Sequence, residues 1–202
     1  MTMNEGGRGR HISFEGIDGA GKTTQAVLLV ERLRELKYRA VYTTEPTYRG
    51  IGAYLRKKII HDDIIHPSLE ALLFATDRVE HYYSEIKKLT SEGVWVISDR
   101  YVHSSYAYQG AILDLEWIKC INRYAPLPDV AFYLDIEPEK ALLRRGEKRT
   151  RFEKREYLEK VREVYLELAK RGEVILINAD REIFEIHREI LEYLSNLNLI
   201  QV

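Results

Sequence analysis

Short apolar runs separate longer stretches in which apolar and polar positions recur with helical spacing. The apolar runs predict five strands, at residues 11–15, 39–44, 94–98, 130–136 and 174–178. The periodic stretches predict helices at residues 25–37, 51–60, 68–88, 114–124, about 137–145, 152–170 and 181–197. Because strands and helices alternate throughout, we expect an α/β fold, with a five-stranded parallel sheet that has helices on both faces.

Composition and charge narrow the kind of protein. The chain has 202 residues and no Pro/Gly/Ser-rich linker, so we expect residues 11–202 to form one domain after a flexible lead-in at residues 1–10. A net charge of -1 gives no basic field for nucleic acid, and no apolar run approaches the length that spans a bilayer. A single cysteine excludes an intrachain disulfide. These features predict a cytoplasmic protein with neither nucleic acid nor membrane as a partner.

One stretch carries a complete chemical signature. The pattern G-x-x-x-x-G-K-S/T is filled in order by Gly16, Ile17, Asp18, Gly19, Ala20, Gly21, Lys22 and Thr23, and Thr24 follows it. The glycines let successive backbone N–H groups converge, and the dipole of the predicted helix favours anions at the same point. We therefore predict a P-loop nucleoside triphosphate hydrolase fold. The alternative is a Gly-rich turn that only joins a strand to a helix.

Four side chains in or near this loop have distinct expected roles. Lys22 would reach the β- and γ-phosphates, and Thr23 would offer its hydroxyl to Mg²⁺. Asp18 is unusual, because a carboxylate among phosphate-binding amides costs repulsion, so we expect it to hold a hydroxyl group or a cation. Asp99 ends a buried strand and has the setting of an acid that holds Mg²⁺ through water, although a turn residue is the alternative.

A phosphoryl acceptor needs a second site. Phe74 and Arg78 lie four residues apart and share a helical face, where a ring can stack on a planar base and a guanidinium can donate to a carbonyl. Spacing alone leaves open that Phe74 belongs to the core and that Arg78 is a solvated charge. Arg100 and Arg49 are candidates for the acceptor phosphate, because a planar fork matches its oxygens.

A basic segment completes the candidate chemistry. Phosphoryl transfer spreads negative charge over the γ-phosphoryl oxygens, and cations placed there lower the barrier. Four arginines surround Gly146 and predict a lid at about residues 144–153: Arg144, Arg145, Arg149 and Arg151. The alternative is a solvated charged face.

Several stretches together closely resemble thymidylate kinase. They are Phe14–Thr24, Glu45–Pro46, Phe74–Arg78, Asp99–Tyr101 and Ser104–Gly110, and the resemblance extends to about Asp180. It implies Mg²⁺- and ATP-dependent phosphorylation of dTMP to dTDP, in dTTP biosynthesis, by a homodimer. The alternatives are a kinase of another nucleotide or deoxynucleoside, and a non-enzymatic nucleotide-binding switch.

The resemblance also implies roles for residues at the acceptor. Phe74 and Arg78 would hold thymine, and Ser105 would address the base edge. Tyr108 matches a tyrosine that lies against the 2′ position of the sugar, where a ribose hydroxyl would be crowded. Asp18 matches a residue that holds the 3′-hydroxyl or, through water, a metal.

Further roles concern the donor and the reaction. The family supplies a catalytic arginine from the loop or from the lid; the loop position here is Gly19, so the lid must supply it. Arg151 is the first choice and Arg149 the second. Other residues expected in catalysis are Lys22, Asp18 and Arg100. Other residues expected to bind substrate or nucleotide are Glu45, Arg144 and Asp180.

Overall fold

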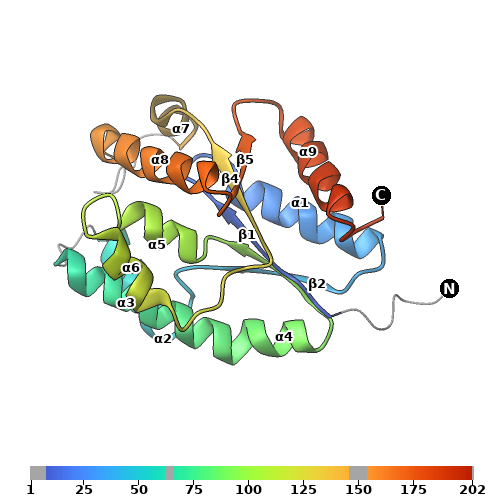
Figure 1. The fold of residues 1–202 in the computed structure, drawn as a ribbon, viewed down its shortest axis with the longest axis horizontal. Coiled ribbons are helices and arrows are strands. Elements are labelled where there is room, and N and C mark those ends of the chain that lie inside the picture. The colour runs from blue at the N-terminus through green and yellow to red at the C-terminus, as the bar shows by residue number, and fades with distance from the viewer. Residues whose placement is uncertain (1–7, 62–65, 146–153, 202) are drawn as a thin grey trace.

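Five parallel strands form the centre of the molecule (Figure 1). The computed structural model describes residues 8–61, 66–145 and 154–201. The strands are β1 (His11–Glu15), β2 (Ala40–Thr44), β3 (Trp95–Asp99), β4 (Val130–Asp135) and β5 (Ile175–Asn178). Their order is β2-β3-β1-β4-β5, and every pair of neighbours is parallel. The predicted five-stranded parallel sheet is confirmed.

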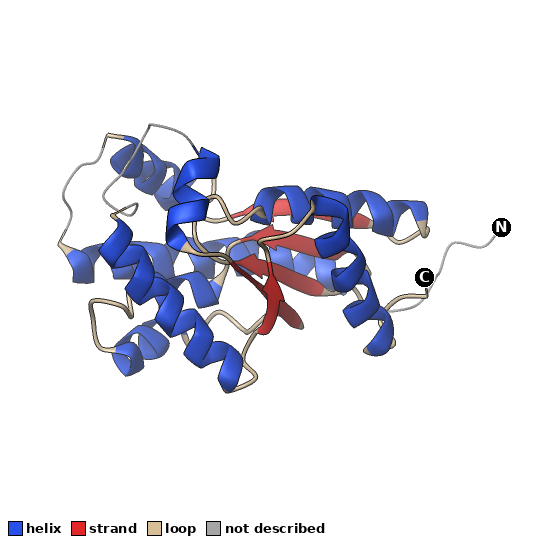
Figure 2. Cartoon of the chain, turned by 90° about the horizontal axis from the view of Figure 1, so that it is seen from above, coloured by secondary structure: helices blue, strands red, loops and turns tan. Residues whose placement is uncertain are grey.

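Helices cover both faces of this sheet, as predicted. Against one face lie α1 (Lys22–Glu35) and α9 (Ile183–Asn196), and against the other lie α5 (Val102–Tyr108) and α8 (Arg155–Lys170), as Figure 1 shows. Figure 2 shows the strands in red between blue helices. The remaining elements are α2 (Gly50–Ile60), α3 (Pro67–His81), the π-helical turn η1 (Tyr82–Ile86), α4 (Lys87–Ser91), α6 (Leu115–Asn122) and α7 (Pro138–Arg145). In the part of the chain that the structure describes, no helix has the length and apolarity needed to cross a bilayer.

The core is centred on the sheet because its side chains are apolar on both faces. Ile12, Val96 and Phe132 have no exposed surface, and the ring of Phe14 stacks on Phe132 with centroids 5.6 Å apart. Burial of each such side chain stabilises the fold by roughly 1.5–3 kcal/mol. Burial on both faces also explains why strands appear in the sequence as apolar runs rather than as alternating positions.

Two helical features differ from the predicted pattern. Residues 101–110 contain α5, which the pattern did not predict; every one of its residues is buried, the polar His103, Ser104 and Ser105 included, so polar positions do not mark an exposed face. The helix predicted at residues 68–88 consists of α3, η1 and α4 in succession. Hydrophobic spacing does not distinguish a single π-helical turn from the α-helix on either side of it.

The ends of three strands meet at one edge of the sheet. Phe14 of β1 and Thr44 of β2 both pair in register with Asp99 of β3. Three parts of the chain therefore lie close together: the loop after β1, the segment that begins at Glu45, and Asp99 itself. This carboxyl edge is where ligands bind in open α/β sheets.

Candidate active site

The segment between β1 and α1 has the geometry of a phosphate-binding loop. Gly16, Gly19 and Gly21 have φ angles of 137°, 88° and 93°, which residues with a side chain rarely adopt. The first turn of α1 contains no acidic residue, so no carboxylate in that turn neutralises the positive end of the helix dipole. Backbone donors and the dipole together favour an anion here.

Gly19 leaves no space for a side chain. A Cβ atom at this position would lie 2.3 Å from the backbone oxygen of Ala141 in α7. The loop of this structure therefore has no room for an arginine at position 19, which agrees with the expectation that a residue outside the loop covers the γ-phosphate. The residues predicted for that role, Arg149 and Arg151, lie outside the described residues, as does most of the predicted lid at 144–153.

Lys22 is buried at the start of α1. Its Nζ donates to the backbone oxygen of Ile17 at 2.8 Å and lies 3.7 Å from Oδ1 of Asp18. Burial lowers the pKa of Lys22 to about 8, and the nearby guanidinium of Arg100 acts in the same direction. A bound phosphate would place negative charge beside this ammonium group and favour its protonated form.

Arg100 joins the phosphate loop to α5. Its Nη1 donates to the backbone oxygen of Gly16 at 3.0 Å, and its Nη2 donates to Oδ1 of Asp18 at 2.5 Å and to the hydroxyl of Tyr108 at 3.2 Å. The Asp18 carboxylate therefore lies between the cations of Arg100 and Lys22. This arrangement offsets the repulsion expected of a carboxylate in an anion-binding loop.

Thr23 and Asp99 have the donor groups of a magnesium site. The Thr23 hydroxyl donates to Oδ2 of Asp99, and both residues line the same cavity. Hydroxyl and carboxylate oxygens suit Mg²⁺, which usually keeps several waters and also binds substrate phosphates. The two side chains that were predicted as metal ligands are thus together and fit that ion.

A cavity of about 580 Å³ connects the phosphate loop with residues of α2, α3 and α5. Most predicted site residues line it: Asp18, Gly19, Gly21, Lys22, Thr23, Thr24, Glu45, Phe74, Arg78, Asp99, Arg100, Ser105, Tyr108 and Arg144. Gly16, Ile17 and Ala20 belong to the loop but do not line the cavity. The phosphate loop and the Phe74/Arg78 pair therefore face one space, large enough for a small-molecule site.

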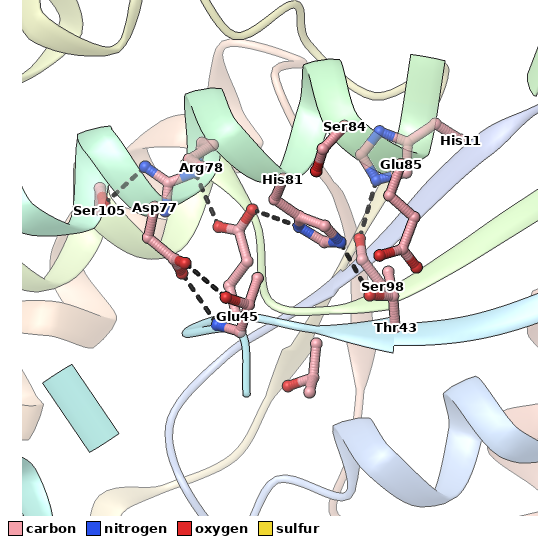
Figure 3. A network of polar contacts seen from close by, with 12 residues as sticks. His11, Thr43, Glu45, Asp77, Arg78, His81, Ser84, Glu85, Ser98 and Ser105 are labelled. Carbon is pink, nitrogen blue, oxygen red and sulfur yellow. Dashed lines mark hydrogen bonds and ion pairs between the residues drawn. The ribbon is translucent and has the colours of Figure 1, made fainter. Parts of the chain in front are cut away.

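Arg78 is the centre of a buried polar network (Figure 3). Its Nε donates to Oε2 of Glu45 at 2.9 Å, and its Nη1 donates to Oγ of Ser105 at 2.9 Å and to Oδ1 of Asn122. Only 1% of Arg78 is exposed, so the alternative of a solvated charge is wrong. Phe74, one turn earlier in α3, is half-buried and lines the cavity.

Outside the phosphate loop, two of the described residues that were predicted as ligand contacts do not line the cavity. Arg49 is exposed, and its Nη2 donates to Oε2 of Glu85 at 2.5 Å. Asp180 accepts from Nζ of Lys140, and its Oδ1 lies 3.7 Å from Nη2 of Arg144, which does line the cavity. The roles assigned to Arg49 and Asp180 stay predictions.

Arg56 lines the cavity although the sequence analysis did not select it. This α2 residue donates from Nε to the backbone oxygen of Thr47 at 3.3 Å, and its guanidinium lies 3.9 Å from the centroid of the Tyr48 ring. Lys57 and Lys58 follow it directly. Basic character alone therefore could not single out Arg56.

Gln109 is a second lining residue that was missed. It follows α5, is 3% exposed, and donates from Nε2 to Oε1 of Glu70 at 3.4 Å. It lies inside the stretch Ser104–Gly110 that carried the resemblance. The sequence could have pointed to Gln109 only through that stretch. Its contact with Glu70, a buried polar residue, depends on the tertiary structure.

The fold and this cavity define a P-loop kinase that acts on a nucleotide. A sequence profile of the family described as thymidylate kinase matches residues 14–190. A protein of Pyrococcus horikoshii named “Probable thymidylate kinase” is 45% identical over 195 residues, which cover 91% of this chain and 95% of that protein. A “Thymidylate kinase” of Caldanaerobacter subterraneus is 40% identical and covers 92% of this chain and 94% of its own.

A solved structure has the same fold. Thymidylate kinase from Candida albicans superposes with a TM-score of 0.83 at 24% identity, over 95% of this chain and 93% of that chain. The chain therefore belongs to the thymidylate kinase family, enzymes that phosphorylate dTMP to dTDP with ATP as donor. The resemblance predicted from the motifs is confirmed, and a non-enzymatic switch is set aside.

Proposed function

We propose that the cavity beside the phosphate loop is where this chain transfers the γ-phosphoryl group of Mg²⁺-bound ATP to the 5′-phosphate of dTMP. Family membership gives the two substrates, and the products are dTDP and ADP. The observation that carries the assignment to this cavity is that Lys22 and Arg78 both line it. One nucleotide held at each end would bring the two phosphate groups together beside Arg100.

The donor end would hold ATP. Backbone amides of the loop and Nζ of Lys22 would contact its β- and γ-phosphates. Thr23 and Asp99 would hold Mg²⁺, which neutralises phosphate charge when bound. No covalent intermediate is required, because positioning and charge neutralisation can carry the transfer.

The acceptor phosphate would lie between two arginines. Arg100 is one, and its contacts with Gly16 and Asp18 hold it beside the phosphate loop. For the second cation, Arg56 is favoured over Arg49, because Arg56 lines the cavity whereas Arg49 is exposed and paired with Glu85. The Asp18 carboxylate would accept a hydrogen bond from the 3′-hydroxyl.

The base would be read by a ring and polar side chains. Thymine would stack on Phe74 while Arg78 donates to a base carbonyl. Nε2 of Gln109 donates to Glu70, so Oε1 of Gln109 is the atom suited to accept from the N3–H group of thymine. Tyr108 would crowd a 2′-hydroxyl and so favour deoxyribose.

The lid would supply the cation over the γ-phosphoryl group. Gly19 cannot carry an arginine without a clash with α7, which supports a source outside the loop. Arg151 is our first candidate and Arg149 the second. We expect Arg151→Ala to lower turnover far more than stability; unchanged turnover would transfer the role to Arg149.

The homodimer, the cytoplasmic location and the lack of a nucleic-acid partner are also proposals. Leu69 and Leu72 on α3 are 51% and 45% exposed and do not line the cavity. Such exposed apolar side chains support contact with a second copy. Size-exclusion chromatography with light scattering should give twice the mass of the 23.7 kDa chain; a monomer at micromolar concentration would contradict the dimer.

The direct test is release of ADP, measured with a panel of nucleoside monophosphates. We expect the highest kcat/KM with dTMP, and a strong dependence of ADP formation on the acceptor. Comparable rates with a purine monophosphate would favour a kinase of another nucleotide. ADP release without any acceptor dependence would reject the proposed transfer.

A further inference from the structure

Arg78 is fixed through only part of its guanidinium. Among the described residues, its hydrogen bonds use Nε, which donates to Glu45, and Nη1, which donates to Ser105 and Asn122. Nη2 is therefore the nitrogen that can donate to a base carbonyl. The direction in which Nη2 points depends on how firmly the other nitrogens are held.

The carboxylate of Glu45 is shared between two donors. Oε2 accepts from Nε of Arg78 at 2.9 Å, and Oε1 accepts from Nδ1 of His81 at 3.0 Å. The Glu45 side chain is 3% exposed, so water cannot readily replace a lost donor. A carboxylate oxygen without a partner would carry a desolvation cost and would turn to find a new donor.

His81 connects this carboxylate to the sheet. It is on α3, one turn after Arg78, and its side chain has no exposed surface. Its Nε2 lies 2.8 Å from Oγ1 of Thr43 in β2. Because a carboxylate only accepts, the hydrogen must be on Nδ1, whether the ring is neutral or cationic. Figure 3 shows the resulting line of contacts from Thr43 through His81 and Glu45 to Arg78.

We propose that His81 is a positioning residue for base recognition, which holds the Glu45 carboxylate in the orientation that directs Arg78 at the base. His81 does not line the cavity and acts only through Glu45. The inference rests on the proposed function, in which Arg78 reads the base. Because small displacements of a bound substrate reduce transfer strongly, a loose Arg78 would affect both dTMP binding and base preference.

Two substitutions separate the two nitrogens of His81. In His81→Asn, the amide nitrogen can take the position of Nδ1 and still donate to Glu45, but the contact with Thr43 is lost. In His81→Gln, the longer side chain can reach Thr43 but has no donor at the position of Nδ1. Both variants carry an amide side chain, but His81→Asn keeps the contact with Glu45 and His81→Gln keeps the contact with Thr43.

We expect His81→Gln to raise KM for dTMP about 10- to 100-fold. This increase corresponds to the loss of one hydrogen bond to a charged group. The ratio of kcat/KM for dTMP to that for dCMP should fall, because dCMP carries an amino group where thymine has its 4-carbonyl. KM for ATP should stay within about twofold, and His81→Asn should stay close to the parent protein. Equal values for the two variants, or an unchanged acceptor preference in His81→Gln, would overturn the proposal.

Two further measurements remove ambiguity. Arg78→Lys separates the proposed role of Arg78 from that of His81. If Arg78→Lys leaves the ratio of kcat/KM for dTMP to that for dCMP unchanged, the proposed role of Arg78 fails. If Arg78→Lys lowers the ratio and a folded His81→Gln does not, only the role of His81 fails. Should His81→Gln not fold, ¹⁵N NMR of the parent protein decides, because a hydrogen on Nδ1 supports the proposal and a neutral Nε2–H tautomer overturns it.

Discussion

The donor and acceptor ends of the cavity are built in different ways. At the donor end, the groups suited to phosphate come from the continuous segment Gly16–Thr24, and many of them are backbone amides. At the acceptor end, separate elements contribute side chains, among them Arg56 of α2, Arg78 of α3 and Tyr108 of α5. One end depends on backbone conformation, and the other depends on the packing of side chains.

This difference follows from what each end has to recognise. The triphosphate group is the same in every nucleoside triphosphate, so backbone donors and a helix dipole suffice to hold it. A particular base needs donors in fixed directions, and a buried donor such as Arg78 is held in its direction by hydrogen bonds to Glu45 and Ser105. Changes at the donor end should therefore affect every acceptor, and changes at the acceptor end should alter which acceptor is used.

The largest effect is expected at the donor end. Lys22→Ala removes the buried ammonium group at the phosphates, and kcat should fall by about 10²–10³ or more with every monophosphate, as for the loss of one preorganised donor. The melting temperature should change little, because the lost hydrogen bond to the Ile17 oxygen is offset by removal of a buried charge whose pKa is lowered by desolvation. Steady-state kinetics with the exposed Lys88→Ala as control would check this. A loss confined to one acceptor would contradict the division between the ends.

At the acceptor phosphate, Arg56 and Arg49 form a matched pair. Arg56→Ala should raise KM for dTMP about 10- to 100-fold, because it removes a charged donor from the cavity. Arg49→Ala should change that KM less than about threefold, since an exposed pair with Glu85 contributes little. Initial rates at varied dTMP and saturating ATP measure both. A larger increase of KM for dTMP in Arg49→Ala than in Arg56→Ala would indicate that Arg49, not Arg56, contacts the acceptor phosphate.

A smaller effect is expected at the sugar. Tyr108→Ala should reduce the preference for dTMP over ribothymidine monophosphate by about tenfold, because space opens where a 2′-hydroxyl would be crowded. Tyr108→Phe keeps the ring and loses only the hydroxyl that accepts from Arg100, so it should narrow the preference less. The ratio of kcat/KM values for the two acceptors is the readout. An unaltered ratio in Tyr108→Ala would reject the role.

The sheet beneath both ends should affect stability rather than acceptor choice. Burial, with a contribution from His81, lowers the pKa of His11 from 6.5 to about 3. Between these values the unfolded state binds a proton that the folded state does not, so His11 makes stability rise with pH by about 1.4 kcal/mol per unit. Because the unfolded-state histidine is only half protonated at pH 6.5, His11→Gln should lose about 1.6 kcal/mol less than the parent between pH 6.5 and 5, measured by urea unfolding. Equal losses would contradict the assignment.

The donor end could be predicted from the sequence because its residues are consecutive. The spacing of Gly16, Gly21 and Lys22 predicts the geometry of the loop, and the apolar runs predict the parallel sheet. The Thr23–Asp99 contact was also within reach, since Asp99 ends a strand at the carboxyl edge.

The acceptor end could be predicted only in part. Phe74 and Arg78 share a helical face, but their spacing alone also fits core and solvent. Asn122, which contacts Arg78, is 44 positions away along the chain and has no local signal. Arg56 stands among other basic residues, and α5 is buried on all sides. Such contacts depend on tertiary packing, which local patterns do not encode.

The most direct test of the central claim is a crystal structure with dTMP and a non-hydrolysable ATP analogue bound together. We predict thymine on Phe74, its carbonyl at Arg78, and a 5′-phosphate oxygen about 3–3.5 Å from the γ-phosphorus of the analogue. A dTMP molecule bound away from Phe74 and Arg78, or with its phosphate turned from Lys22, would contradict the account.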